Sequence, residues 1–155
     1  MAERTLIFRG TPPIDPLNAL ALLESPFHAV WFPPDARLTT PAEGDRVWLV
    51  WHDGGPGPAL LLGTGRLKAA GDGELRWTNR TAPGIRELAR QFGYKGPGNM
   101  AFLRLERPRI APANCTLPGL GTVPPGLSEA TEPQRRLLES ALPLVDRRSN
   151  RLRLP

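Results

Sequence analysis

Cysteine, histidine and lysine are scarce in this chain of 155 residues. The one cysteine, Cys115, excludes an internal disulfide, and the two histidines, His28 and His52, show no metal-ligand spacing. No apolar run approaches the roughly 20 residues of a membrane-spanning helix. The first residues lack the long apolar stretch and cleavage site of a signal peptide. We therefore expect a cytoplasmic protein with no membrane partner.

Glycine and proline, in contrast, are abundant, with 16 and 19 residues. This content excludes a helical bundle and favours a β-rich domain with many turns. The length fits one domain, which we place at residues 1–142. Residues 143–155 contain four arginines against one aspartate and are predicted to be a basic tail.

The formal net charge is +5, and 18 of the 20 basic residues are arginine. Arginine suits bidentate contacts with phosphate and bases, as in nucleic-acid-binding proteins. The same excess also arises from the codon usage of a GC-rich genome. Because the tail contributes +3, residues 1–142 carry only +2. Net charge alone therefore does not establish a nucleic-acid partner.

Short alternating apolar segments, separated by turn residues, predict a small sheet with flanking helices. The predicted strands cover residues 5–9, 27–32, 46–51, 59–69, 74–78 and 99–106, with a hairpin turn at 70–73. The predicted helices cover residues 16–24, about 83–92 and about 131–142. Thr131 and Gln134 form a capping-box pattern at the start of the last helix, and Pro143 is predicted to end it. Residues 108–126 are rich in proline and predict an extended loop.

The motifs of catalysis are incomplete. His52 and Asp53 are a lone pair, and Cys115 has no base next to it in sequence. Ser128 lies in a near-match to a nucleophile elbow, but no histidine follows it as the triad order requires. Gly63 and Gly65 lie within a strand pattern and do not form a dinucleotide-binding loop. We predict no catalytic residue, no metal site and no cofactor.

Tryptophans and basic residues form the clearest candidate binding set. Trp48 and Trp51 alternate onto opposite faces of one strand, so at least one indole is directed away from the main core. An exposed indole can stack on a base while nearby cations bind phosphates. The alternative is that the tryptophans are simply core residues. The candidate nucleic-acid-binding residues are Trp31, Trp48, Trp77, Arg66, Lys68, Arg76 and Arg80.

One stretch resembles the PUA-like superfamily, especially its EVE and ASCH branches. A Gly44-Asp45 turn precedes the apolar strand 46–51, and Gly63-Thr64-Gly65 lies in the strand that follows. The aromatic segment Trp31-Phe32 ahead of the turn is also similar to the EVE pattern. The match covers about residues 27–70. The resemblance implies a pseudobarrel that binds RNA or modified bases in DNA, with Trp31, Trp48 and Trp77 near the pocket.

We therefore predict an α+β protein with a small, mainly antiparallel β-barrel of the PUA-like type and two or three short flanking helices. The predicted function is a non-catalytic module that binds RNA or DNA. One alternative is a protein-interaction domain that docks a partner through residues 108–126 and 131–142. Another is an enzyme for a small or nucleotide substrate, which requires His52, Asp53 or Glu106 to converge near the loop 93–99.

Overall fold

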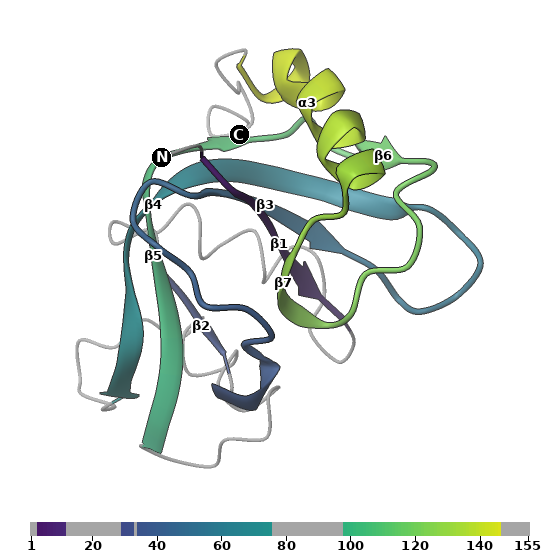
Figure 1. Cartoon of the computed structure of the whole chain (residues 1–155). Helices are drawn as coiled ribbons and strands as arrows, with labels where there is room; N and C mark the ends of the chain where they lie inside the picture. The colour runs from purple at the N-terminus through teal and green to yellow at the C-terminus, as the bar shows by residue number, and fades with distance from the viewer. Residues whose placement is uncertain (1–2, 12–28, 33, 76–97, 147–155) are drawn as a thin grey trace, which may run out of the picture.

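The computed structural model describes residues 3–11, 29–32, 34–75 and 98–146. This part of the chain forms seven strands, one 3-10 turn and one helix (Figure 1). The strands are β1 (Thr5–Gly10), β2 (Ala29–Phe32), β3 (Arg46–Trp51), β4 (Ala59–Leu75), β5 (Gly98–Ile110), β6 (Thr116–Leu117) and β7 (Gly126–Glu129). The 3-10 turn η1 covers Pro34–Ala36, and the helix α3 covers Glu132–Asp146. The predicted helices 16–24 and 83–92 lie outside the described residues.

All seven strands belong to one sheet in the order β2-β5-β4-β3-β1-β7, with β6 paired to β4. The sheet is mainly antiparallel, as predicted, and β1 and β3 are its parallel pair. β3 lies in its interior, which explains why the strand is apolar on both faces. The Gly44-Asp45 turn leads into β3, with Gly44 at φ +92°. The Asp45 carboxylate accepts a hydrogen bond from the Ala42 N–H over 2.9 Å.

The prediction of a hairpin turn at residues 70–73 is wrong. β4 continues through this segment to Leu75, and β5 pairs with it along its length, including Gly71 with Phe102. The ladder satisfies the backbone groups that a local turn would otherwise satisfy. A Cβ atom on Gly71 would lie 3.4 Å from the Phe102 ring, which is an ordinary van der Waals contact, so the ring packs directly over the glycine. Tertiary pairing therefore overrides the local turn preference.

The two edges of the sheet meet at one point. Just after β2, Arg37 forms an isolated parallel bridge with Leu127 of β7, and the Leu38 N–H donates to the Leu127 carbonyl over 2.8 Å. The turn η1 interrupts the extended backbone between β2 and this bridge. The described strands thus form an open, curled sheet, and the predicted barrel is not closed by a continuous ladder among them.

The curled sheet buries apolar side chains on both faces. The inner cluster includes Leu6, Phe8, Phe32, Val47, Leu49, Leu67, Leu103, Leu105 and Leu127. The outer cluster includes Ile7, Trp48, Val50, Leu61, Leu117, Leu120, Val123, Leu138 and Val145. Helix α3 lies across this outer face (Figure 1). The proline-rich segment 108–126 is therefore partly core: it contains the end of β5, all of β6 and the start of β7, and its apolar side chains are used inside the protein.

Helix α3 begins with the predicted capping box. The Thr131 N–H donates to Gln134 Oε1 over 2.9 Å, and the Gln134 N–H donates to Thr131 Oγ1 over 3.3 Å. The predicted end at Pro143 is wrong, because the helix continues to Asp146 and buries Val145. Pro143 has no N–H to donate to the Glu139 carbonyl, so the helix lacks one hydrogen bond there, and the burial of Val145 favours its continuation. No helix in the described part of the chain has the length and apolarity needed to cross a membrane.

Candidate nucleic-acid interface

A bulge between β4 and β5 shapes the candidate site. Thr64 pairs with Arg109 and Arg66 pairs with Glu106, so Arg107 and Pro108 together lie opposite Gly65. Arg107 has φ +48°, which turns the β5 backbone locally. A Cβ atom on Gly65 would lie 3.1 Å from Leu105 Cβ and 3.4 Å from Pro108 Cα. Glycine at this position therefore lets the bulged strand approach closely, and bulges of this kind redirect side chains.

The bulge borders a hollow of about 310 Å³, which we call the arginine hollow. Its lining residues are Arg46, Thr64, Gly65, Arg66, Glu106, Arg107 and Arg109. Arg46 comes from β3, Arg66 from β4, and Arg107 and Arg109 from β5. Thr64 is fully buried and its hydroxyl donates to the Val47 carbonyl over 2.8 Å, so it supports the sheet beneath the hollow. Four arginines from three neighbouring strands thus line one concave surface.

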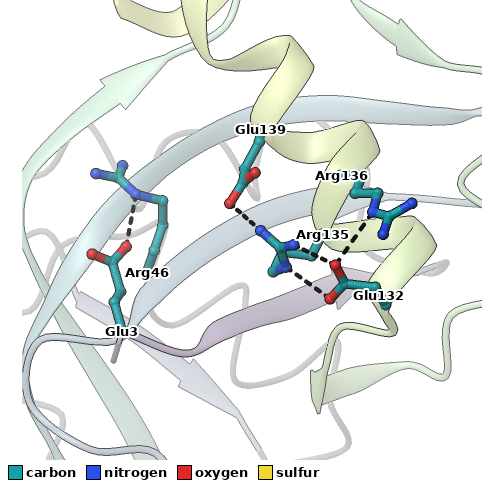
Figure 2. Close-up of polar contacts among 6 residues, drawn as sticks. All are labelled: Glu3, Arg46, Glu132, Arg135, Arg136 and Glu139. Carbon is teal, nitrogen blue, oxygen red and sulfur yellow. Dashed lines mark hydrogen bonds and ion pairs between the residues drawn. The ribbon is translucent and has the colours of Figure 1, made fainter. Parts of the chain in front are cut away.

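Glu3 bridges two of these arginines. Its Oε1 atom lies 3.2 Å from Arg46 Nε, and its Oε2 atom lies 3.1 Å from Arg66 Nη1. Figure 2 shows the Glu3–Arg46 pair. One carboxylate therefore holds guanidinium groups from two neighbouring strands near each other. Each guanidinium group has five N–H donors, so Glu3 accepts from only a few of the donors of these two arginines.

Positive charge continues beyond the arginine hollow. Lys68 and Arg104 are exposed on β4 and β5, and Ala69 pairs with Arg104 in the ladder between them. With the four arginines of the hollow they make six cationic side chains, and Glu106 lies among them in the lining of the hollow. We call this set of six the cationic band. Because its members lie on three neighbouring strands, β3, β4 and β5, the sheet holds them near one another.

The charged residues of helix α3 are arranged differently. Glu132 accepts hydrogen bonds from Arg135 and Arg136, and Arg135 also pairs with Glu139 (Figure 2). The hydrogen bonds from Arg135 lower the pKa of the Glu132 carboxyl to about 2. Two carboxylates thus neutralise two guanidinium groups on the helix, whereas the lining of the arginine hollow contains four arginines and one carboxylate residue, Glu106.

The structure places the predicted site residues in three groups. Arg66 lines the arginine hollow, and Lys68 is exposed on the same strand two residues away. Trp48 is 1% exposed within the outer cluster beneath α3, so the prediction that it lines a pocket is wrong for this structure. Its indole faces away from the inner core, as the alternation implied, but the helix covers it.

The remaining predicted residues are not placed at the site. Trp31 lies on β2 and pairs in register with Phe102 of β5. Trp77, Arg76 and Arg80 lie outside the described residues.

Sequence reasoning missed Arg46, Arg107 and Arg109. Arg46 is 20 residues from Arg66 along the chain, and Arg107 and Arg109 are more than 40 residues from it, so only the pairing of β3, β4 and β5 brings them together. A signal was present in the Arg107-Pro108-Arg109 sequence, because a proline in a strand pattern often marks a bulge. The register against Gly65 could not be read from sequence.

A second hollow, of about 570 Å³, lies between the loops 52–58 and 117–123. Its lining includes Arg9 and His52, but both are engaged in holding the loops. Arg9 donates to the Val123 and His52 carbonyls over 2.6 and 3.3 Å, and burial lowers its pKa. His52 Nδ1 accepts from the Gly54 N–H over 3.0 Å, and its Nε2 lies 2.8 Å from the Gly57 carbonyl. These contacts assign both side chains a structural role.

The described residues offer little for nucleophilic or metal chemistry. Burial raises the pKa of the Cys115 thiol, which disfavours the reactive thiolate. Ser128 is a half-buried residue of β7, paired with Ile7 of β1. In the part of the chain that the structure describes, no group of three or more histidine, cysteine, aspartate or glutamate side chains could hold a metal ion.

Comparisons with known proteins identify the fold. No protein-family model and no curated protein matches the sequence. Among solved structures, the chain is similar to an ASCH protein from Zymomonas mobilis, with a TM-score of 0.54 and 16% identity over 88% of this chain and 94% of that one. A single-residue variant of that protein gives a TM-score of 0.52 with 16% identity over 89% and 98% of the two chains. The chain thus has the fold of ASCH domains, one of the two branches of the PUA-like superfamily that the sequence resembles.

Proposed function

We propose that this protein is a nucleic-acid-binding module that holds the phosphates of a single strand on the cationic band and carries out no chemistry on it. The observation that carries this proposal is the convergence of Arg46, Arg66, Arg107 and Arg109 on one hollow. The planar guanidinium fork matches two phosphate oxygens, so clustered arginines are suited to phosphate. The PUA-like fold supports the same reading, because the resemblance implies RNA or DNA as the ligand.

The strand would leave the arginine hollow along β4 and β5. Side chains two residues apart on one face of a strand lie about 6.5–7 Å from each other. Arg66 and Lys68 are two residues apart on β4, but the register against β5 shifts between Leu67 and Ala69, so their spacing departs from this value. Arg104 pairs with Ala69 across the ladder. Cations that follow one another along paired strands suit a flexible strand with repeated negative charges.

Bases would stack beside this row. Phe102 is half-buried on β5, two residues from Arg104, and pairs with Trp31 in the register between β2 and β5. Aromatic side chains next to phosphate-binding cations are the usual arrangement in proteins that bind single strands. We keep Trp31 and Trp77 as the proposed stacking residues, with Arg76 and Arg80 as further phosphate contacts, and withdraw Trp48.

The test is fluorescence anisotropy with a labelled 12-nucleotide single-stranded RNA and the matching DNA at several salt concentrations. The variant Arg66→Gln/Arg107→Gln removes two charges from the hollow. We therefore expect the slope of the logarithm of the association constant against the logarithm of the salt concentration to become about 1.4 less negative. Arg136→Gln is the matched control, because it removes an arginine from the balanced cluster on α3. Thermal unfolding of each variant checks that it is folded.

Wild-type protein that binds neither strand at low salt would refute the proposed function. If the double variant and the wild type bind with the same affinity and salt slope, the cationic band is not the binding surface. The RNA and DNA arms together assign the type of nucleic acid.

A further inference from the structure

Two of the arginines that line the hollow already share one anion, which is the carboxylate of Glu3. Its two oxygens contact guanidinium groups on two different strands, at 3.2 Å for Arg46 and 3.1 Å for Arg66. Arg107 and Arg109 approach the same hollow from β5. The structure therefore shows that a single group with several anionic oxygens can be shared by arginines from separate elements.

We propose that the arginine hollow binds the terminal phosphate of a nucleic-acid strand in preference to the phosphates within the strand. This inference rests on the proposed function and names the part of the strand that the hollow recognises. The ligand is a phosphate monoester at a strand end. The internal diesters then follow along Lys68 and Arg104.

The first argument is the number of free oxygens. A phosphate monoester presents three acceptor oxygens, whereas a diester within the strand has two that are not esterified. The four arginines of the hollow lie on three strands and surround a concave space, so they can approach one group from several sides. A terminal group can enter such a space, while an internal diester must leave room for the chain on both sides.

The second argument is charge. A phosphate monoester carries about −1.5 to −2 at pH 7, since its second pKa is about 6, and a diester carries one negative charge. Arg46, Arg66 and Arg107 line the hollow, and such cations attract a dianion more strongly than a monoanion.

Size gives the third argument. At about 310 Å³ the hollow is near the lower limit of small-molecule sites, which hold about 300–1,000 Å³. It can accept a phosphate and the adjoining sugar, and the remainder of a strand must lie outside it.

The experiment compares labelled 12-nucleotide strands of one sequence that carry a 5′-phosphate, a 3′-phosphate or hydroxyls at both ends, as RNA and as DNA. We expect at least one phosphorylated end to bind about tenfold more tightly than the hydroxyl strand at pH 7.5. The preference should decrease as the pH falls below about 6, because the monoester becomes a monoanion. Arg66→Gln/Arg107→Gln should lose the preference, and Arg136→Gln should keep it.

The outcomes separate this inference from the proposed function. If all three strands bind equally well and the double variant weakens their binding, the proposed function stands and the terminal-phosphate site is overturned. A preference that persists in the double variant would also overturn it, since recognition would lie elsewhere. Adenosine monophosphate and inorganic phosphate serve as competitors. If either displaces the strand at a concentration near the strand's own Kd, the hollow is a site for free phosphate compounds and not for strand ends.

Discussion

Replacing Gly126 with alanine should separate the two edges of the curled sheet. Gly126 begins β7 and has φ +92°. A Cβ atom there would lie 2.2 Å from the Ala36 carbonyl oxygen and 2.8 Å from Ala36 Cβ. Both atoms belong to η1 just before the Arg37–Leu127 bridge, so the substitution presses directly on the contact that joins the edges.

The expected cost has two parts. An L-residue in a left-handed conformation loses about 1–2 kcal/mol. Relieving the contact with Ala36 requires η1 and β7 to move apart, which endangers the Leu38–Leu127 hydrogen bond, with a net value of about 1 kcal/mol. It also disturbs the packing of Leu127, which is fully buried. Together these effects should lower the free energy of unfolding by about 3 kcal/mol or more.

Thermal unfolding followed by circular dichroism measures this effect. For a chain of this size, about 3 kcal/mol lowers Tm by about 6–12 °C. Gly44→Ala is the matched control, because Gly44 also has φ +92° but nothing within 4 Å of an added Cβ. We expect this control to lose only about 2–8 °C, from the backbone strain alone. Equal losses of Tm in the two variants would refute the tight approach of η1 to β7.

Two further predictions concern helix α3. Leu138→Ala should destabilise the protein by about 2–5 kcal/mol in urea unfolding, since this side chain of α3 is fully buried in the outer cluster. Leu144→Ala, at a side chain that is 44% exposed, should stay within about 0.5 kcal/mol, and similar losses in both would mean that the helix is not packed on the sheet as described. NMR titration of the Glu132 carboxyl should give a pKa of about 2 at low salt, rising toward its ordinary value of 4.5 in Arg135→Gln. Because this pKa is lowered on folding, the stability that the pair contributes is present above about pH 4.5 and lost as the pH falls toward 2, and a wild-type pKa near 4.5 would contradict the hydrogen bonds drawn in Figure 2.

The sequence by itself determined the features that depend on neighbouring residues. The alternation of 46–51 identified β3 and its two apolar faces, because side chains alternate across any strand. The spacing of Thr131 and Gln134 identified the start of α3, since the capping box closes within one turn. The Gly44-Asp45 and Gly63-x-Gly65 segments, through their resemblance to PUA-like proteins, pointed to the fold that the comparisons found.

Tertiary structure decided what local signals could not. Turn residues at 70–73 became strand because β5 pairs with them, and Pro143 stayed within α3, where Val145, two residues farther along, is buried. The indole of Trp48 faces away from the inner core, as its position in the strand required, but packing of α3 leaves it only 1% exposed.

The arginine hollow is the clearest example of this division. Arg66 was identified from sequence, but Arg46 and Arg107 join it only through the register of three strands and the bulge opposite Gly65. A shift of one residue would direct these side chains to the other face of the sheet, because strand side chains alternate. The sequence therefore determined that arginines are present in the strands, and long-range pairing determined that they converge.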